Sequence, residues 1–276
     1  MEIYGSNFTY AGISSLADHL ILANVDTSRY QQIAGETKSN TVFSKRGNRL
    51  YYTGTDFSDS PVSFDADIVT EDGSPIPSGD IRRIEKWLFN APGYRKLYID
   101  ECDLYTAARA EYVNGVEKRL YLNARFSNAS AIEGNGGIVG YSCTVECDSL
   151  MAWQDATAVT VATGLAAGGN TIVDITVDSD LKDYIYPKIT FQMGGSGGDL
   201  TVANNSDDEA RLTVFTALPA SANFIMNSAI NYISGGNYIR FSGKNFIRLV
   251  DGVNHLSIIG NLQSITVEYQ NRRYLK

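Results

Sequence analysis

The sequence predicts a mainly β protein, with an N-terminal antiparallel β-sandwich or split barrel that carries one α-helix and a C-terminal β-sandwich. Short runs alternate apolar and polar residues, which is the period of a strand with one buried face. Twenty-five glycines stand against 6 prolines, with 17 tyrosines and 11 phenylalanines, a composition typical of short strands joined by tight turns. The length of 276 residues exceeds the roughly 100–150 residues of a typical single domain. We therefore expect two domains.

Composition and charge exclude several classes of protein. Hydrophobic residues make up 43% and charged residues 20% of the chain, which is typical of a folded chain. No run approaches the ~20 consecutive apolar residues of a membrane helix, and residues 16–25 lack the basic start and cleavage site of a signal peptide. We expect no membrane insertion. The net charge of −8 argues against a protein that holds nucleic acid by neutralising phosphates.

The three cysteines, Cys102, Cys143 and Cys147, are too few for a disulfide framework, and their number is odd. Cys143 and Cys147 are expected on one face of a strand, with Cα atoms roughly 13 Å apart. That distance is too long for a disulfide bridge. We expect three buried free thiols in a chain folded in a reducing cytoplasm.

The first elements are expected to be strands around one hairpin. Short strands are expected at residues 20–24 and 41–43, and Gly47-Asn48 can supply the positive φ angles of a tight turn within residues 43–52. From residue 62 to residue 69, apolar residues alternate with Ser63, Asp65 and Asp67. This alternation predicts a strand with one apolar face and one wet or paired face.

One α-helix is expected at residues 80–91. Asp80 or Ser78 can cap its N-terminus, and Pro92-Gly93 ends it. Its apolar residues recur at helical spacing, with one tryptophan beside them: Ile81, Ile84, Trp87, Leu88 and Ala91. The sequence predicts Ile84, Trp87 and Leu88 as structural residues buried against a sheet.

Strands joined by short turns follow the helix. In the N-terminal domain they are expected at residues 95–100, 104–112, 119–128 and 137–146, which favours antiparallel pairing. Residues 151–155 lack alternation, so we place the domain boundary near residue 153, giving domains 1–153 and 154–276. Beyond the boundary, about eight alternating runs with no helix among them predict a β-sandwich.

No catalytic or metal-binding pattern is recognisable. His19 and His255 are the only histidines, and neither lies near a nucleophile motif. The cysteines match no zinc-ligand spacing. The glycine-rich residues 194–199 precede a strand and not a helix, so we interpret them as a flexible hairpin tip and not as a phosphate loop. We expect no catalytic residue, no cofactor and no metal.

Charged clusters have ordinary explanations. Asp65 and Asp67 could form the carboxylate pair of a glycosidase, but we expect them to face solvent or to pair with Arg82 or Arg83 across an interface. The acidic groups at residues 100–103 and 207–209 lie at expected turns, where carboxylates are solvated. Residues 94–98 and 272–274 interleave basic and aromatic side chains, which in an acidic chain does not make a nucleic-acid platform.

A more specific signal lies in residues 81–105, where the helix with Trp87-Leu88 is followed by Tyr94-Arg95-Lys96-Leu97, an acidic turn and Tyr105. This order resembles the N-terminal domain of distal tail proteins of long-tailed, non-contractile bacteriophages. The agreement extends from the strand at residues 62–69 to residues 145–147, where such domains close before a Trp-containing linker, here 151–153. Residues 254–260 and 265–269 resemble the last two strands of the galectin-like sandwich of the same family.

The resemblance implies a structural protein of the virion tail tip, assembled in the cytoplasm of the bacterial host. It implies a ring, expected to be a homohexamer, that joins the tail tube to the baseplate or to a tail-associated fibre or lysin protein. DNA and the tape-measure protein would pass through its centre without specific binding. The interface candidates are the strand carboxylates and the basic residues of the hairpin at residues 43–52: Asp65, Asp67, Lys45, Arg46 and Arg49.

Two other readings remain open. A carbohydrate-binding module of a surface or tail adhesin would explain the C-terminal sandwich but not the helix-containing N-terminal half. Galectin-type sites stack the sugar on a tryptophan, and the only tryptophans, Trp87 and Trp153, lie outside residues 154–276. A glycosidase is the third reading. The expected strands occupy residues 154–276. We therefore expect no arm-like extension of the kind that larger members of the resembled family insert into the C-terminal sandwich.

Overall fold

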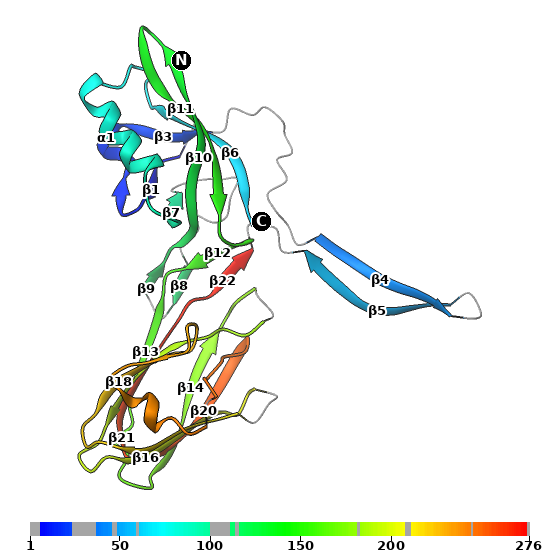
Figure 1. The fold of residues 1–276 in the computed structure, drawn as a ribbon, viewed down its shortest axis with the longest axis vertical. Helices are drawn as coiled ribbons and strands as arrows, with labels where there is room; N and C mark the ends of the chain where they lie inside the picture. Colours follow the sequence, from blue (N-terminus) through cyan, green and yellow to red (C-terminus); the bar gives the residue numbers. More distant parts are fainter. Residues whose placement is uncertain are drawn as a thin grey trace. The chain divides into compact units, whose positions relative to one another are not determined.

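The computed structural model divides the chain into two compact units, Met1–Trp153 with Arg273–Lys276 (unit 1) and Gln154–Arg272 (unit 2). It confirms the mainly β fold class (Figure 1). The described residues are 6–23, 37–45, 49–58, 61–99, 111–113, 116–180, 183–207, 211–243 and 245–274.

Unit 1 is built on an antiparallel sheet with the strand order β2-β1-β7-β10-β11-β6-β3. Strand β12 pairs with β10, and the C-terminal strand β22 pairs with β12. The strands are β1 (Phe8–Tyr10), β2 (Ile13–Ser14), β3 (Leu20–Ala23), β6 (Ser63–Thr70), β7 (Arg95–Ile99), β10 (Leu120–Gly134), β11 (Gly137–Cys147), β12 (Met151–Gln154) and β22 (Arg272–Tyr274). A 3-10 turn, η1 (Ser15–Asp18), joins β2 to β3.

The single α-helix of the described residues, α1, spans Ser78–Phe89 and not residues 80–91. Its N-cap residue is Pro77, and no side chain caps the helix there. The expected cap by Ser78 or Asp80 is therefore wrong, because the fixed φ of proline already starts the helix and Asp80 lies within the first turn. The Asp80 carboxylate instead pairs with Arg83 one turn later, at 3.0 Å.

Helix α1 packs on one face of the unit 1 sheet (Figure 1). Ile84, Trp87 and Leu88 are buried, and they share one hydrophobic core with residues of the strands beneath. The Trp87 ring stacks on the Phe8 ring at 5.8 Å between centroids. Its Nε1 donates a 2.9 Å hydrogen bond to the Tyr10 carbonyl oxygen. The indole thus fixes the helix to strand β1.

Two small antiparallel ribbons complete unit 1. Strands β4 (Thr37–Lys45) and β5 (Arg49–Ser58) pair with each other (Figure 1) and with no other strand of the described residues. The hairpin predicted at residues 43–52 is the turn-proximal part of this longer ribbon. Strands β8 (Glu111–Val113) and β9 (Val116–Lys118) form the second ribbon. Most of the strand expected at 104–112 lies outside the described residues.

Unit 2 consists of a five-stranded sheet, β13-β21-β15-β18-β19, and a four-stranded sheet, β14-β20-β16-β17. One core holds side chains from both sheets; for example, Phe215 of β17 contacts Phe224 of β18 at 5.0 Å between ring centroids. The strands are β13 (Thr157–Ala162), β14 (Asn170–Val177), β15 (Lys188–Met193), β16 (Gly198–Asn204), β17 (Leu212–Leu218), β18 (Asn223–Asn227), β19 (Tyr232–Ile233), β20 (Gly252–Gly260) and β21 (Leu262–Tyr269), with the 3-10 helix η3 (Asn237–Arg240).

The glycine-rich segment at residues 194–199 is not a hairpin tip, because β15 and β16 belong to different sheets. The segment crosses from one sheet to the other, and the Asn261 side chain holds it by donating to Ser196 Oγ and to the Gly197 carbonyl oxygen. A side chain at Gly194 would collide with Asn261. Glycine is needed there for close approach, not for flexibility.

Residues 151–155 and the basic tail form more structure than the sequence predicts. Strand β12 covers Met151–Gln154, where we expected a linker, and β22 covers part of the tail. The backbone amide of Gln154 donates to the Asn271 carbonyl oxygen at 2.9 Å, and the Asn271 side chain donates to Gln154 Oε1. Because β22 pairs with β12, the last four residues group with unit 1 and not with residues 154–272.

Asp207, expected at a solvated turn, is buried in unit 2. Its carboxylate accepts two hydrogen bonds from Arg248, from Nε at 2.7 Å and from Nη2 at 2.8 Å. Only 2% of the Asp207 side chain and 6% of the Arg248 side chain is exposed, and the guanidinium carbon lies 3.5 Å from the centroid of the Tyr184 ring. The remaining members of that acidic group, Asp208 and Glu209, lie outside the described residues.

Replacing Trp87 by alanine is expected to lower the free energy of unfolding by roughly 3–5 kcal/mol, because a large buried side chain is removed. Trp87→Phe keeps most of the packing and should cost less. Thermal and chemical denaturation measure both changes. Arg82→Ala, on the exposed side of α1, is the control and should stay within about 0.5 kcal/mol of the parent. A Trp87→Ala variant as stable as the parent would contradict the assignment of Trp87 as a buried structural residue.

Replacing one partner of the Asp207–Arg248 pair is expected to lower the free energy of unfolding more than replacing both partners by apolar residues. Asp207→Asn leaves a buried guanidinium without its counter-charge, which typically costs about 3–5 kcal/mol. The double variant Asp207→Leu/Arg248→Met should recover most of that loss, since apolar replacements of buried pairs are often neutral. Urea denaturation of Asp207→Leu, Arg248→Met and the double variant gives the coupling energy. Purely additive effects would argue against a coupled pair.

Candidate assembly surfaces

The carboxylates of Asp65 and Asp67, here called the β6 acidic pair, lie on the face of the sheet opposite α1. Side chains alternate along a strand, and Ala66, between them, belongs to the core beneath the helix. Asp65 is exposed and accepts a 2.8 Å hydrogen bond from Thr144 Oγ1, and Asp67 is half-buried. Within the described residues neither carboxylate forms an ion pair with Arg82 or Arg83.

The basic candidates of the hairpin are only partly described. Lys45 ends β4 and Arg49 begins β5, and the two residues are register partners. Arg46 lies outside the described residues. The structure therefore places two of these three residues at the turn end of an antiparallel ribbon.

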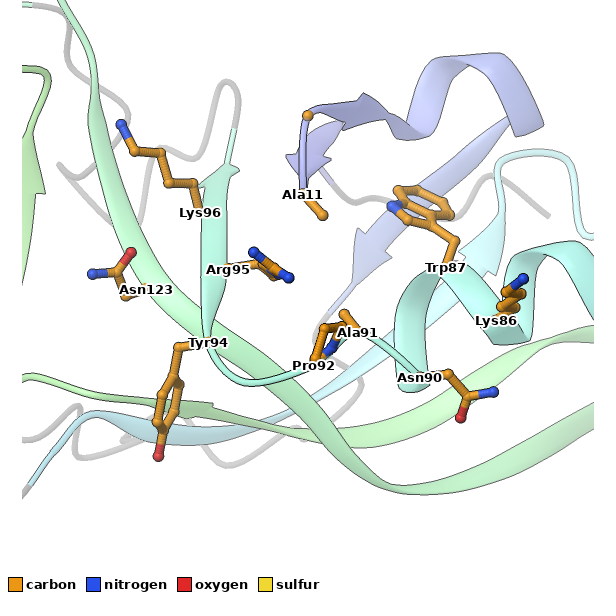
Figure 2. A pocket seen from close by; sticks show the side chains of 11 residues that line it. Ala11, Lys86, Trp87, Asn90, Ala91, Pro92, Tyr94, Arg95, Lys96 and Asn123 are labelled. Atoms are coloured by element: carbon orange, nitrogen blue, oxygen red, sulfur yellow. The ribbon is translucent and has the colours of Figure 1, made fainter.

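A groove of about 620 Å³ lies beside α1, at the β1–β2 turn and the start of β7 (Figure 2). The residues that line it include Lys86, Trp87, Asn90, Arg95, Lys96 and Asn123. In Figure 2, the Arg95 guanidinium points toward the helix that carries Lys86 and Trp87. No carboxylate is among the described residues that line it. We call it the cationic groove.

Sequence reasoning noticed part of this groove but not its shape. The basic and aromatic cluster at residues 94–98 was visible in the sequence. Another part of the lining comes from Ala11 and Gly12, which pairing of β1 with β7 brings next to residues 95–99. No local pattern reports a contact between segments more than 80 residues apart in the chain.

The two histidines lie in separate, exposed settings. His19 ends η1 in the left-handed conformation, with φ 51°. His255 Nδ1 lies 2.7 Å from Asp174 Oδ1 in an exposed pair on strands β20 and β14. Within the described residues, no three His, Cys, Asp or Glu side chains gather to hold a metal. In that same part of the chain, no helix is long and apolar enough to cross a membrane.

Cys143 and Cys147 are buried free thiols, while Cys102 lies outside the described residues. Burial raises the pKa of Cys143 to about 12, and the nearby charges of Asp67 and Asp65 add to the shift. Burial likewise raises the pKa of Cys147 to about 12, with a contribution from Asp148. Both thiols therefore stay protonated across the physiological pH range. A reactive thiol needs the opposite conditions.

Comparison with known proteins identifies the class: phage tail proteins. A family model described as phage tail protein N-terminal domain matches residues 3–149, and a model described as phage tail C-terminal domain matches residues 152–269. The chain belongs to this family. The resemblance predicted from the sequence is thereby confirmed, and the chain is a structural tail protein and not an enzyme.

Solved structures agree over nearly the whole chain. The crystal structure of the Dit protein of phage SPP1, titled a paradigm of the hub adsorption apparatus in phages that infect Gram-positive bacteria, aligns with a TM-score of 0.60 at 12% identity and covers 98% of this chain and 99% of that one. A chain of the phage P2 baseplate in its activated conformation with Ca aligns with a TM-score of 0.53 at 10% identity, covering 98% of each chain. A search of curated protein sequences finds no match.

The buried thiols give a direct test of the unit 1 core. In a Cys102→Ser background, Ellman's reagent at pH 8 is expected to label no thiol in the native protein and two after denaturation, because both pKa values lie far above 8 and both sulfurs are covered. The labelling rate should then follow unfolding of unit 1. Rapid labelling of either cysteine in the folded protein would contradict the buried placement.

Proposed function

We propose that this protein forms a closed ring of six copies at the tip of the phage tail. The ring would join the tail tube to the baseplate or to a tail-associated fibre or lysin protein, and it would be assembled in the host cytoplasm. The observation that carries the proposal is the agreement with the SPP1 Dit fold over 98% of this chain, together with the family match. Unit 1 would carry the ring contacts, and unit 2 would lie at the periphery.

The β4–β5 ribbon supports assembly through unit 1. A two-stranded ribbon is marginally stable in water by itself, and its outer strand edges leave backbone donors and acceptors unpaired. Strands β4 and β5 have nine and ten residues and pair with no other strand of the described part of the chain. A neighbouring copy that pairs with an edge of the ribbon would satisfy these groups.

A ring at the tail tip must let DNA and the tape-measure protein pass. A lumen rich in Lys and Arg would retain DNA, since each phosphate contact releases a counterion and strengthens binding. The net charge of −8 favours passage, because like charges repel weakly across the lumen. The rival function, a carbohydrate-binding module, accounts for unit 2 alone, whereas the family models match both units.

Light scattering and negative-stain electron microscopy of the purified chain test the ring. The expected result is a closed particle of about six times the 30.2 kDa chain mass. Shortening the β4–β5 ribbon by removing residues 40–55 and closing it with a Gly-Ser linker should abolish the particle, because the strand edges are lost, and leave the melting temperature of the unit 1 core nearly unchanged.

The control is a two-residue insertion in the β10–β11 turn at Asn135-Gly136, which should leave the ring intact. A monomer at every concentration and salt tested, with or without the tail tube protein, would contradict the proposal. A ring unaffected by loss of the ribbon would retain the proposed function but remove β4–β5 from the contact.

A further inference from the structure

We infer that adjacent copies of this chain meet through the cationic groove of one copy and the β6 acidic pair of the next. The inference rests on the proposed ring and names its contact surfaces. It begins from four charged side chains that lie in these two surfaces and form no ion pair with the described residues: Lys86, Arg95, Asp65 and Asp67.

Several exposed charges of unit 1 are paired within the chain. Arg83 binds Asp18 and Asp80, and Arg125 Nε donates to Glu146 at 2.6 Å. Lys86 and Arg95, both exposed, form no ion pair with the described residues. Asp65 and Asp67 likewise have no cationic partner in the described part of the chain. Among the described residues, these two cations and two carboxylates are open to an external partner, as are Arg82 and Glu133, which lie outside both surfaces.

The two surfaces face in different directions, as a ring requires. Arg95 is the register partner of Ala124 and lies on the α1 side of the sheet, since Ala124 and Leu97 belong to the core under the helix. Asp65 and Asp67 lie on the other side. Strands β7 and β6 are also three positions apart in the sheet, about 14 Å at the usual strand spacing. One copy cannot close this contact on itself.

A head-to-tail ring joins unlike surfaces, so every copy offers one groove and one acidic pair to two different neighbours. The carboxylates of the β6 acidic pair stand on alternate residues of one strand, with Cα atoms about 7 Å apart. Both carboxylates can enter an open groove of about 620 Å³ side by side. There the Lys86 ammonium and the Arg95 guanidinium supply counter-charge, and the Asn90 amide supplies further donors.

Charge reversal tests the pairing. The groove variant Lys86→Glu/Arg95→Glu and the pair variant Asp65→Lys/Asp67→Lys should each remain monomeric where the unchanged chain forms rings, because like charges then face each other. Circular dichroism and melting curves verify that both variants are folded. Matched reversals outside both surfaces, Arg82→Glu on α1 and Glu133→Lys on β10, should assemble normally.

Mixing the two variants gives the sharpest result. The reversed groove of the first fits the reversed pair of the second, and the two unreversed surfaces fit each other. An equal mixture should therefore form rings with strictly alternating variants, which native mass spectrometry detects as equal numbers of each. Alternation also requires an even number of copies.

The outcomes separate this inference from the proposed function. If both variants alone form rings like the parent, the charge pairing is wrong and the ring stands. If each is monomeric but their mixture stays monomeric, the pairing is also wrong. If the unchanged chain never assembles, both fail. If the groove variant assembles but loses retention of double-stranded DNA in a gel shift that the parent shows, the groove binds a polyanion and not a second copy.

Discussion

The Trp87 side chain holds unit 1 together at the point where its helix meets its first strand. The indole stacks on Phe8 and donates to the Tyr10 carbonyl oxygen, so one residue ties α1 to β1 by both packing and a directional bond. A buried indole N–H without an acceptor would be costly, which fixes the axial position of the helix. That position brings Lys86 to the edge of the groove whose other side carries Arg95.

Strand alternation then separates the charges of the sheet. On β6, the residues between the acidic positions enter the core, so Asp65 and Asp67 must leave on the far side. On β7, Leu97 is buried and Arg95, two residues earlier, shares its side. The two strands also lie toward opposite edges of one sheet. Strand alternation therefore places a cation on one face of the sheet and two carboxylates on the other. Unlike faces are what a head-to-tail assembly uses.

Local patterns in the sequence predicted those elements whose period or turn chemistry is complete within a dozen residues. The apolar stripe of α1, the alternation in residues 62–69 and the turn near Gly47 are of this kind. The predictions were wrong where a partner that is distant in the sequence determines the burial or the pairing of a segment. Asp207 resembles a turn carboxylate until Arg248, 41 residues on, is placed beside it. The glycine segment 194–199 resembles a hairpin until the pairing of β15 and β16 with different strands is known. The cationic groove was missed for the same reason.

The longest-range pairing also changes how the two units are joined. Strand β22 pairs with β12, and unit 1 holds both Met1–Trp153 and Arg273–Lys276, so the chain leaves unit 1 once and comes back. Next to this pairing, the Asn271 side chain donates to Gln154 across 117 residues of sequence. Unit 2 is therefore an insertion between two strands of the unit 1 sheet, and not a module that follows a linker. A division at residue 153 separates β12 from its partner and exposes a strand edge.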